Sequence, residues 1–333
     1  YSWDADMMKN VVIDKDSTLG GSAKPIIVYG GITVNDGATL TIVPGTTIFF
    51  HADAGIDVYG RLMCMGDAGN EITLRGDRLD NMFDYLPYDY VSGQWQGIRL
   101  RESSYENEIR YTDVHGTFDG LKVDSADVSR LKLDIENSTI HNCQGYALTA
   151  ENAKIIMRNC EFTNALRNCI CINGGETDIN NCTIAQFYPF DSNRGSALYF
   201  SMNKYPQCSF TCINSLVTGY ADDEMMIETY DEGEKYEANY LFDHCIIRTP
   251  KITTEDSIHF VNVIFEEYED TVKTGRKNFV KIDSQNLRYD FRLDSISPAI
   301  NAADPVSAMP YDRKGRKRDD KPDIGAYEFF KEE

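Results

Sequence analysis

The sequence is poor in positive charge and has no long apolar run. Its 33 Lys and Arg stand against 53 Asp and Glu, which gives a formal net charge of −20 over 333 residues. A field of this sign repels nucleic acid and anionic membranes. It suits neutral or cationic ligands or divalent cations, and it can also serve solubility alone. No window approaches 18 consecutive apolar residues, so we expect no membrane-spanning helix. The chain begins Tyr1-Ser2-Trp3 without an initiator Met, which is expected of a mature chain whose signal segment has been removed.

Paired metal-ligand and redox motifs are also missing. The nine cysteines are an odd number, so they cannot all pair, and none form a CxxC motif. Cys169 and Cys171 share one strand face, but two thiolates do not make a zinc site. The five histidines form neither an HxH nor an HExxH motif. We expect the cysteines to fill the core, with a disulfide or a metal site as the alternative, and the histidines to lie at corners or on the surface, with a general base as the alternative. We expect no cofactor, and Ca²⁺ remains open.

A repeat of about 22 residues organises the chain. Its copies have small or medium central residues, which are Thr112, Ser138, Cys160, Cys182, Ser215, Cys245 and Val263. Apolar residues three before and two after most centres predict two strands with a bend between them. Asn fills the bend at 137, 159, 181, 214 and 262, and His244 replaces it once. Asn tolerates the left-handed backbone of a tight corner, and the exchange of Cys with Ser, Thr and Val indicates a small buried position.

A strand, an Asn corner, a second strand and a loop describe one turn of a β-solenoid. Residues 31–76 agree, since they read as short strands at 32–34, 39–42, 46–50, 56–59, 62–65 and 72–74, separated by turn signals. Leucine-rich repeats have a similar period, but the Leu-x-x-Leu-x-Leu frame is absent. No amphipathic helix of ordinary length is evident. The sequence therefore predicts an all-β chain of stacked coils.

Two stretches resemble known proteins. "GATLTIVPGTTIFF…GIDVYGRL" with "WQGIRL" (Trp95–Leu100) is similar to the opening coils, and "SPAINAAD…DRKGRKRDDKPDIGAYEF" (Ser297–Phe329) to the closing segment, of pectate-lyase-like β-helix proteins of the secreted or surface-anchored bacterial type. The resemblance implies a single-stranded right-handed parallel β-helix of about ten coils. It leaves function open, because lyases, hydrolases, epimerases and adhesins share this scaffold.

We expect one domain over residues 1–333, with an N-terminal cap at 1–30, coils at 31–290 and a C-terminal wrapping segment at 291–333. The cap and the wrap are expected to protect the solenoid ends. Loop insertions are predicted at 77–94, 187–194, 202–208 and 220–240. In the last of these, Asp222, Asp223 and Glu224, or Asp231 with Glu232, could hold Ca²⁺ or form a solvated acidic loop. The basic run at 310–322 is expected to form salt bridges within the wrap.

In enzymes that the chain resembles, substrate lies along one parallel sheet, and here that groove strand should follow each Gly-rich restart. Alternation predicts that the following side chains point outward in successive coils: Arg99 and Arg101, Lys122 and Asp124, Ala147 and Thr149, and Tyr199 and Glu228. Arg or Lys could neutralise a uronate and a basic residue could remove its α-proton, which makes Arg99, Arg101, Lys122 and Asp124 candidate catalytic residues. A mixed-charge face also arises from solubility alone. A glycosidase needs two nearby carboxylates, and Asp124 and Glu228 lie several coils apart.

Three functions are compatible with the sequence. The first is a monomeric protein, secreted or on the outer surface of a bacterial cell, that binds polysaccharide through Tyr85, Tyr88, Tyr90, Tyr199 and Glu228, because Tyr offers an apolar ring and a hydroxyl to a sugar. The second is a polysaccharide lyase or glycoside hydrolase acting on an acidic polysaccharide. The third is a non-catalytic adhesin or structural surface scaffold. No nucleic-acid partner is expected.

Overall fold

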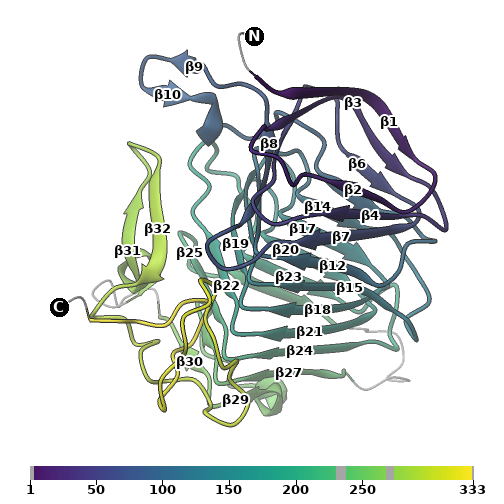
Figure 1. Ribbon diagram of the computed structural model, residues 1–333. Coiled ribbons are helices and arrows are strands. Elements are labelled where there is room, and N and C mark those ends of the chain that lie inside the picture. Colours follow the sequence, from purple (N-terminus) through teal and green to yellow (C-terminus); the bar gives the residue numbers. More distant parts are fainter. Residues whose placement is uncertain (1–3, 230–237, 268–273, 332–333) are drawn as a thin grey trace.

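The strands stack into a right-handed parallel β-solenoid, which confirms the predicted fold, with about nine coils where about ten were expected (Figure 1). The computed structural model describes residues 4–229, 238–267 and 274–331. Within these ranges the helical elements are the short 3₁₀ turns η1 (Tyr88–Tyr90), η2 (Glu255–His259) and η3 (Gly275–Asn278). No helix of the described residues is long and apolar enough to cross a membrane.

Each coil contributes to three faces. The groove face contains β6 (Ile56–Val58), β11 (Ile98–Leu100), β14 (Leu121–Val123), β17 (Leu148–Glu151), β20 (Ile170–Asn173), β23 (Leu198–Ser201) and β26 (Met225–Glu228). From β11 to β26, these are the six strands predicted to follow the restarts. They pair in parallel, so equivalent side chains of successive coils lie side by side.

The middle face is a ten-stranded sheet. It contains β2 (Ser17–Leu19), β4 (Thr39–Ile42), β7 (Arg61–Met65), β12 (Asn107–Arg110), β15 (Leu131–Glu136), β18 (Lys154–Arg158), β21 (Glu176–Asn180), β24 (Ser209–Ile213), β27 (Tyr240–Asp243) and β29 (Phe260–Val261). The third face is called the tail face because the C-terminal segment covers it. It contains β5 (Thr47–Phe50), β8 (Ile72–Gly76), β13 (Thr112–His115), β16 (Thr139–Cys143), β19 (Glu161–Ala165), β22 (Thr183–Gln186), β25 (Leu216–Gly219), β28 (Ile246–Ile247) and β30 (Ile264–Phe265).

The N-terminal strands begin the stack. The long strand β3 (Ile26–Val34) pairs with β5 through its first part and with β6 through its last part, so it runs over two faces. Strand β1 (Asp6–Ile13) pairs with β3 and covers this end of the solenoid (Figure 1). Two antiparallel hairpins project from the coils, β9 (Asn81–Phe83) with β10 (Leu86–Pro87) and β31 (Phe279–Asp283) with β32 (Arg288–Leu293).

The predicted asparagine corners are confirmed. The five residues have φ between 49° and 52° and join the middle face to the tail face; they are Asn137, Asn159, Asn181, Asn214 and Asn262. His244 has φ 49° at the equivalent corner, as the repeat predicted. The residue after each corner starts a strand of the tail face or immediately precedes one. Cys160, Cys182 and Cys245 hold this position, are fully buried and fill the core as expected.

The C-terminal segment lies along the tail face, whereas we expected it to protect an end of the solenoid. Outward side chains of that face, such as Phe187 and Leu216, pack with Phe291 and Ile324 in a second hydrophobic core. A segment with this much apolar surface is stabilised by covering a long apolar stripe. The predicted salt bridges of the basic run are present (Arg318 Nη1 lies 3.1 Å from Glu328 Oε2).

Corner asparagines hold the segment in place. Asn137 Nδ2 donates to the carbonyl of Asp312 (2.7 Å), and Asn159 Nδ2 donates to that of Tyr311 (2.8 Å). Further along, Asn181 Oδ1 accepts from the Met309 amide and Asn214 Oδ1 from the Asp304 amide, both at 2.8 Å. The asparagines therefore turn the chain with their backbone and bind the C-terminal segment with their side chains. We call this series the asparagine ladder.

Candidate functional site

The groove face carries a row of outward side chains, one from each strand. Parallel register aligns Asp57 with Arg99, Arg99 with Lys122, and Lys122 with Thr149. The register continues through Cys171, whose side chain is buried, to Tyr199. Thr149 points outward as predicted, but the prediction for Ala147 is wrong, because Ala147 is fully buried just before β17.

A cavity of about 380 Å³ opens at one end of this row. Arg99, Arg101 and Lys122 line it together with Asp57, Asp119 and Phe118. Asp124, the fourth predicted catalytic residue, contacts Arg99 beside the cavity. The structure therefore brings the four predicted residues into one cluster, on the neighbouring strands β11 and β14 and the residues that follow them.

Both arginines of the cluster already pair with carboxylates. Arg101 forms two hydrogen bonds with Asp57, at 2.5 and 2.8 Å, and these raise the pKa of its guanidinium. The Arg99 Nε lies 3.1 and 3.2 Å from the two oxygens of Asp124. Lys122 is exposed and forms no ion pair within the described part of the chain. Charge in this cluster is thus largely neutralised before any ligand binds.

Glycines form the floor of the cavity. Gly97 has φ +80°, and a Cβ there would lie 1.8 Å from the Asp119 carbonyl oxygen of the next coil. A Cβ at Gly55 would likewise lie 2.8 Å from the Gly97 carbonyl oxygen. Only glycine fits where backbones of successive coils approach this closely. The Gly-rich restarts recognised in the sequence therefore make a cavity floor of main-chain atoms without side chains.

The other predicted pair lies toward the opposite end of the groove face. Tyr199 donates its hydroxyl hydrogen bond to Glu228 Oε2 at 2.7 Å, and Asn203 Nδ2 donates to the same oxygen at 3.0 Å. Asn203 belongs to the 202–208 insertion, whose Lys204 also pairs with Glu151 of β17 at 2.5 Å. This insertion therefore borders the groove face at its edge with the middle face.

The tyrosines of the 77–94 insertion do not join this row. Tyr85 is 78% exposed at the β9–β10 turn. Arg78 lies over the ring of Tyr88, and Arg288 of hairpin β31–β32 lies over the ring of Tyr90. Tyr90 lines a second cleft, of about 310 Å³, above the tail face. The predicted binding residues thus divide between two places.

The acidic loop residues differ from the expected Ca²⁺ cluster. Glu224 is fully buried, and its two oxygens accept hydrogen bonds from the amides of Ala197 and Ala221. Burial raises the pKa of Glu224 to about 8. Glu224 therefore ties two chain segments together and does not face solvent with Asp222 and Asp223. Asp231 and Glu232 lie outside the described residues.

Two functional candidates were missed because no motif marks them. His115 and His141 were expected at a corner or on the surface, but they lie on β13 and β16 above the tail face, and His115 is only 8% exposed. They are cross-strand partners, and both contact Asp113. A signal was present, since each histidine lies three residues after a repeat centre, Thr112 or Ser138. Aligning the repeats stacks the two rings.

Comparison with known proteins addresses the fold. The structure of a pectate lyase, "Crystal structure of pectate lyase Pel9A", aligns with 98% of this chain and 97% of that chain, at 13% sequence identity and a TM-score of 0.36. No curated protein matches the chain. Residues 15–184, about half of the chain, match the family model described as "Right handed beta helix region". The chain therefore belongs to the right-handed β-helix family.

Proposed function

We propose that this protein binds a polysaccharide of neutral sugars along the groove face. The observation that carries the proposal is the row from Asp57 to Tyr199, in which every coil except that of the buried Cys171 adds one accessible side chain. Successive strands lie about 4.8 Å apart, so the row offers contacts at a regular spacing comparable with the length of a sugar ring. A repeating surface of this kind suits a repeating polymer.

The side chains of the row suit sugar hydroxyls. The Arg99–Asp124 and Arg101–Asp57 pairs present both donors and acceptors, and sugar hydroxyls can use either. Phe118 is 41% exposed at the cavity wall and offers an apolar ring to a sugar face. Tyr199 supplies a second ring toward the other end.

Charge favours neutral sugars over uronates. Four carboxylates, of Asp53, Asp57, Asp119 and Asp124, stand against three cations, of Arg99, Arg101 and Lys122, in and beside the cavity. A polyanion would be repelled by this excess of carboxylates and by the net charge of −20. Lyase chemistry needs cations available to the substrate carboxylate, and both arginines already have partners. Lys122 is the residue that favours the alternative of a lyase, because it lines the cavity and forms no ion pair with the described residues.

A polysaccharide ligand fits the location expected from the sequence resemblance. Such polymers are abundant outside cells, so the proposal includes a protein that is secreted or held on the outer surface of a bacterial cell. A non-catalytic adhesin would use the same face. The proposal therefore concerns binding, and catalysis is an outcome of its test.

Affinity electrophoresis and calorimetry test the proposal with a panel of neutral glucan, xylan and mannan, and with polygalacturonate. We expect at least one neutral polymer to bind, and Tyr199→Ala and Lys122→Ala each to weaken binding about three- to tenfold, as expected for one lost hydrogen bond. Lys251→Ala, at an exposed lysine remote in sequence from the groove strands, should bind like the wild type.

Two results would overturn the proposal. Absence of binding to every neutral polymer would leave the structural scaffold as the function. An increase in the absorbance of unsaturated uronide on polygalacturonate, lost in Lys122→Ala, would show that the groove face is a lyase active site.

A further inference from the structure

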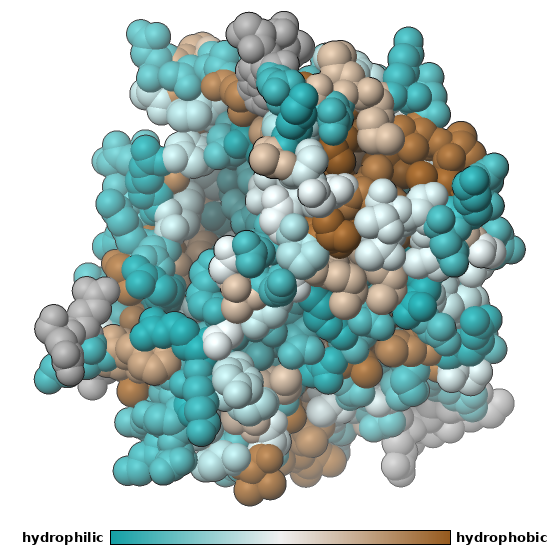
Figure 2. Space-filling view, in the orientation of Figure 1, coloured by the Kyte–Doolittle hydropathy of each residue, from teal (hydrophilic) through white to brown (hydrophobic). Residues whose placement is uncertain are grey.

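The second cleft lies between the tail face and hairpin β31–β32. Figure 2 shows a hollow there, bordered by hydrophilic residues, and Figure 1 shows the hairpin standing beside the solenoid. The cleft has a volume of about 310 Å³ and is lined by Tyr90, Asp113, His141, Glu161 and Tyr289, among others. It shares no residue with the groove cavity.

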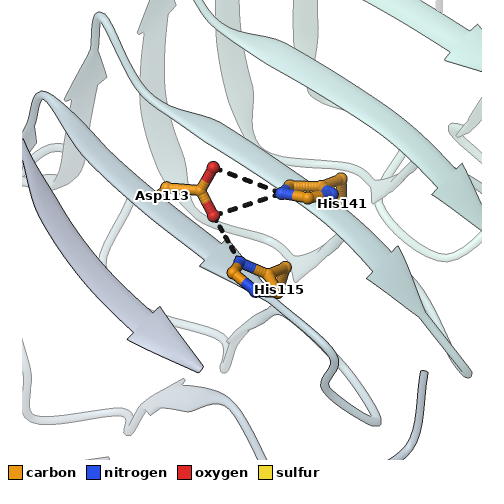
Figure 3. A group of neighbouring side chains, drawn as sticks. All are labelled: Asp113, His115 and His141. Carbon is orange, nitrogen blue, oxygen red and sulfur yellow. Dashed lines mark hydrogen bonds and ion pairs between the residues drawn. The ribbon is translucent and has the colours of Figure 1, made fainter. Parts of the chain in front are cut away.

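Three potential metal ligands meet beside this cleft: Asp113 and His141 line it, and the buried His115 contacts Asp113. Asp113 and His115 are two apart on β13 and so point to the same side, and His141 is the cross-strand partner of His115 on β16. His115 Nδ1 lies 2.5 Å from Asp113 Oδ1, and His141 Nε2 lies 3.1 and 3.2 Å from the two oxygens of Asp113 (Figure 3). The ligand atoms of the three side chains all lie within 4.8 Å of one another.

These distances between ligand atoms are close to the distances between the ligand atoms around a bound metal ion. Bonds of about 2.0–2.2 Å to a tetrahedral zinc ion place its ligand atoms about 3.4 Å apart. Small side-chain movements would therefore bring Asp113, His115 and His141 around one ion. Among the described residues, this is the group of His, Cys, Asp and Glu side chains whose ligand atoms converge.

A carboxylate behind His115 fixes the direction of its ring. His115 Nε2 lies 2.9 Å from Asp89 Oδ1, and Arg75 holds Asp89 through an ion pair of 2.7 Å. The other ring nitrogen, Nδ1, is thereby directed at Asp113. Metal-binding histidines characteristically bond a carboxylate through the nitrogen that is not ligated. The 77–94 insertion supplies this outer residue, because Asp89 belongs to η1.

Two carboxylates flank the ring of His115. Asp113 Oδ1 lies beside its Nδ1 and Asp89 Oδ1 beside its Nε2. Arg288, Arg313 and Lys314 also line the cleft, so carboxylates and cations both surround the cluster.

We propose that Asp113, His115 and His141 form a binding site for a divalent transition-metal ion, of which Zn²⁺ is the first to be tested. Two imidazoles and one carboxylate suit zinc and iron, whereas Ca²⁺ and Mg²⁺ prefer oxygen ligands alone. Three protein ligands would leave one coordination position open, and a water or an oxygen of a molecule in the adjoining cleft would complete the coordination. This inference is independent of the proposed groove-face function.

Calorimetric titration of Zn²⁺ into chelator-treated protein tests the site. We expect one ion for each chain, a rise in melting temperature with Zn²⁺, and visible absorption bands on Co²⁺ substitution. His141→Gln and Asp113→Asn should abolish this stoichiometric binding. Asp89→Asn, which leaves all three ligands in place, should weaken it about 10- to 100-fold.

The matched control is His51→Gln. His51 also pairs with an aspartate, Asp77, at 2.7 Å, but lacks a second histidine in the arrangement, so this variant should bind Zn²⁺ like the wild type. Circular dichroism of each variant separates loss of ligand from loss of fold. The site is refuted if the wild type binds no stoichiometric Zn²⁺ or if His141→Gln and Asp113→Asn bind it unchanged. If His141→Gln or Asp113→Asn unfolds, Asp89→Asn provides the test instead. A Zn²⁺ affinity of Asp89→Asn equal to that of the wild type would then refute the site.

Discussion

Arg313 and Glu71 form a two-point ion pair across 242 residues of sequence. The guanidinium nitrogens lie 2.9 and 3.1 Å from the two carboxylate oxygens, and Arg313 Nε also donates to Thr139 Oγ1 at 3.0 Å. Arg313 is 1% exposed, whereas Glu71 remains partly accessible. One buried side chain of the C-terminal segment therefore joins two coils of the tail face.

Arg313→Ala should lower the free energy of unfolding by about 3 kcal/mol. This is the low end of the range for a broken buried ion pair, because water can still solvate Glu71. Urea denaturation measures the change, and Lys317→Ala, at an exposed neighbour, should remain within about 0.5 kcal/mol of the wild type. Equal stability of the two variants would show that Arg313 does not anchor the segment.

The same pair predicts a dependence on pH. Burial alone would raise the pKa of Glu71, but Arg313 and Lys314 lower it below its ordinary value. A lowered carboxyl pKa contributes stability that is present above about pH 4.3, the pKa in the unfolded chain, and is lost as pH falls through the folded value. The stability difference between wild type and Glu71→Gln should therefore shrink as pH falls below about 4. A difference that stays constant across this range would contradict the prediction.

The asparagine ladder can be separated into its backbone and side-chain contributions. Asn159 has φ 51°, donates to the Tyr311 carbonyl and accepts from Arg318 Nη2 at 3.0 Å. Asn159→Ala loses both contributions and should cost about 2–4 kcal/mol, whereas Asn159→Gly keeps the backbone conformation and should cost less.

Asn152 provides the control for this comparison. It has φ 40°, but its side chain forms no hydrogen bond with the described residues. Asn152→Ala should therefore cost only about 1 kcal/mol, from the backbone conformation. Chemical denaturation of the three variants measures the order, and an equal cost for Asn152→Ala and Asn159→Ala would exclude a side-chain role for the ladder.

The thiols should be unreactive in the folded protein. All nine cysteines are free and buried, and burial raises the pKa of Cys64 and of Cys143 to about 12. The thiolate is the reactive form, so a thiol reagent such as Ellman's reagent should label none of them quickly at neutral pH and all nine in denaturant. Rapid labelling of several thiols under native conditions would contradict the burial described above.

Removing carboxylates should change the charge preference of the groove face. Asp57→Asn with Asp124→Asn would free Arg101 and Arg99 from their ion pairs. We expect the double variant to bind polygalacturonate about tenfold more tightly than the wild type, with the gain falling at high salt because it is electrostatic. Affinity electrophoresis at two ionic strengths measures this. An unchanged affinity would show that carboxylate pairing does not set the preference.

The coils could be predicted because the repeat constrains each residue locally. Asn137 and Asn159 each need a left-handed backbone, and Cys160 needs a small space, so the pattern is visible in single copies. The observed strands β4 (Thr39–Ile42), β5 (Thr47–Phe50) and β7 (Arg61–Met65) agree with the expected ranges to within one residue. Alternation also placed Arg99 and Lys122 side by side on the groove face.

The remaining features depend on contacts between distant residues. The partners of Arg99 and Arg101 come from neighbouring coils, so the sequence showed cations but not their neutralisation. Tyr90 lies beneath Arg288 of hairpin β31–β32, which is nearly 200 residues later in the sequence. His115 and His141 form no sequence motif, because they lie on two different strands and are 26 residues apart in the chain. The C-terminal segment has no period of its own, so only packing reveals the face that it covers.

The asparagine ladder has a consequence for how this chain can change over time. Solenoids readily gain and lose whole coils by duplication or deletion, because each coil contacts only its neighbours. Here the continuous C-terminal segment is hydrogen-bonded to four successive corners, from Asn137 to Asn214. An added or deleted coil within that span would shift every later corner by one strand spacing relative to its hydrogen-bond partner in the C-terminal segment. The segment therefore fixes the number of coils that it covers, and coils can be gained or lost only on either side of it.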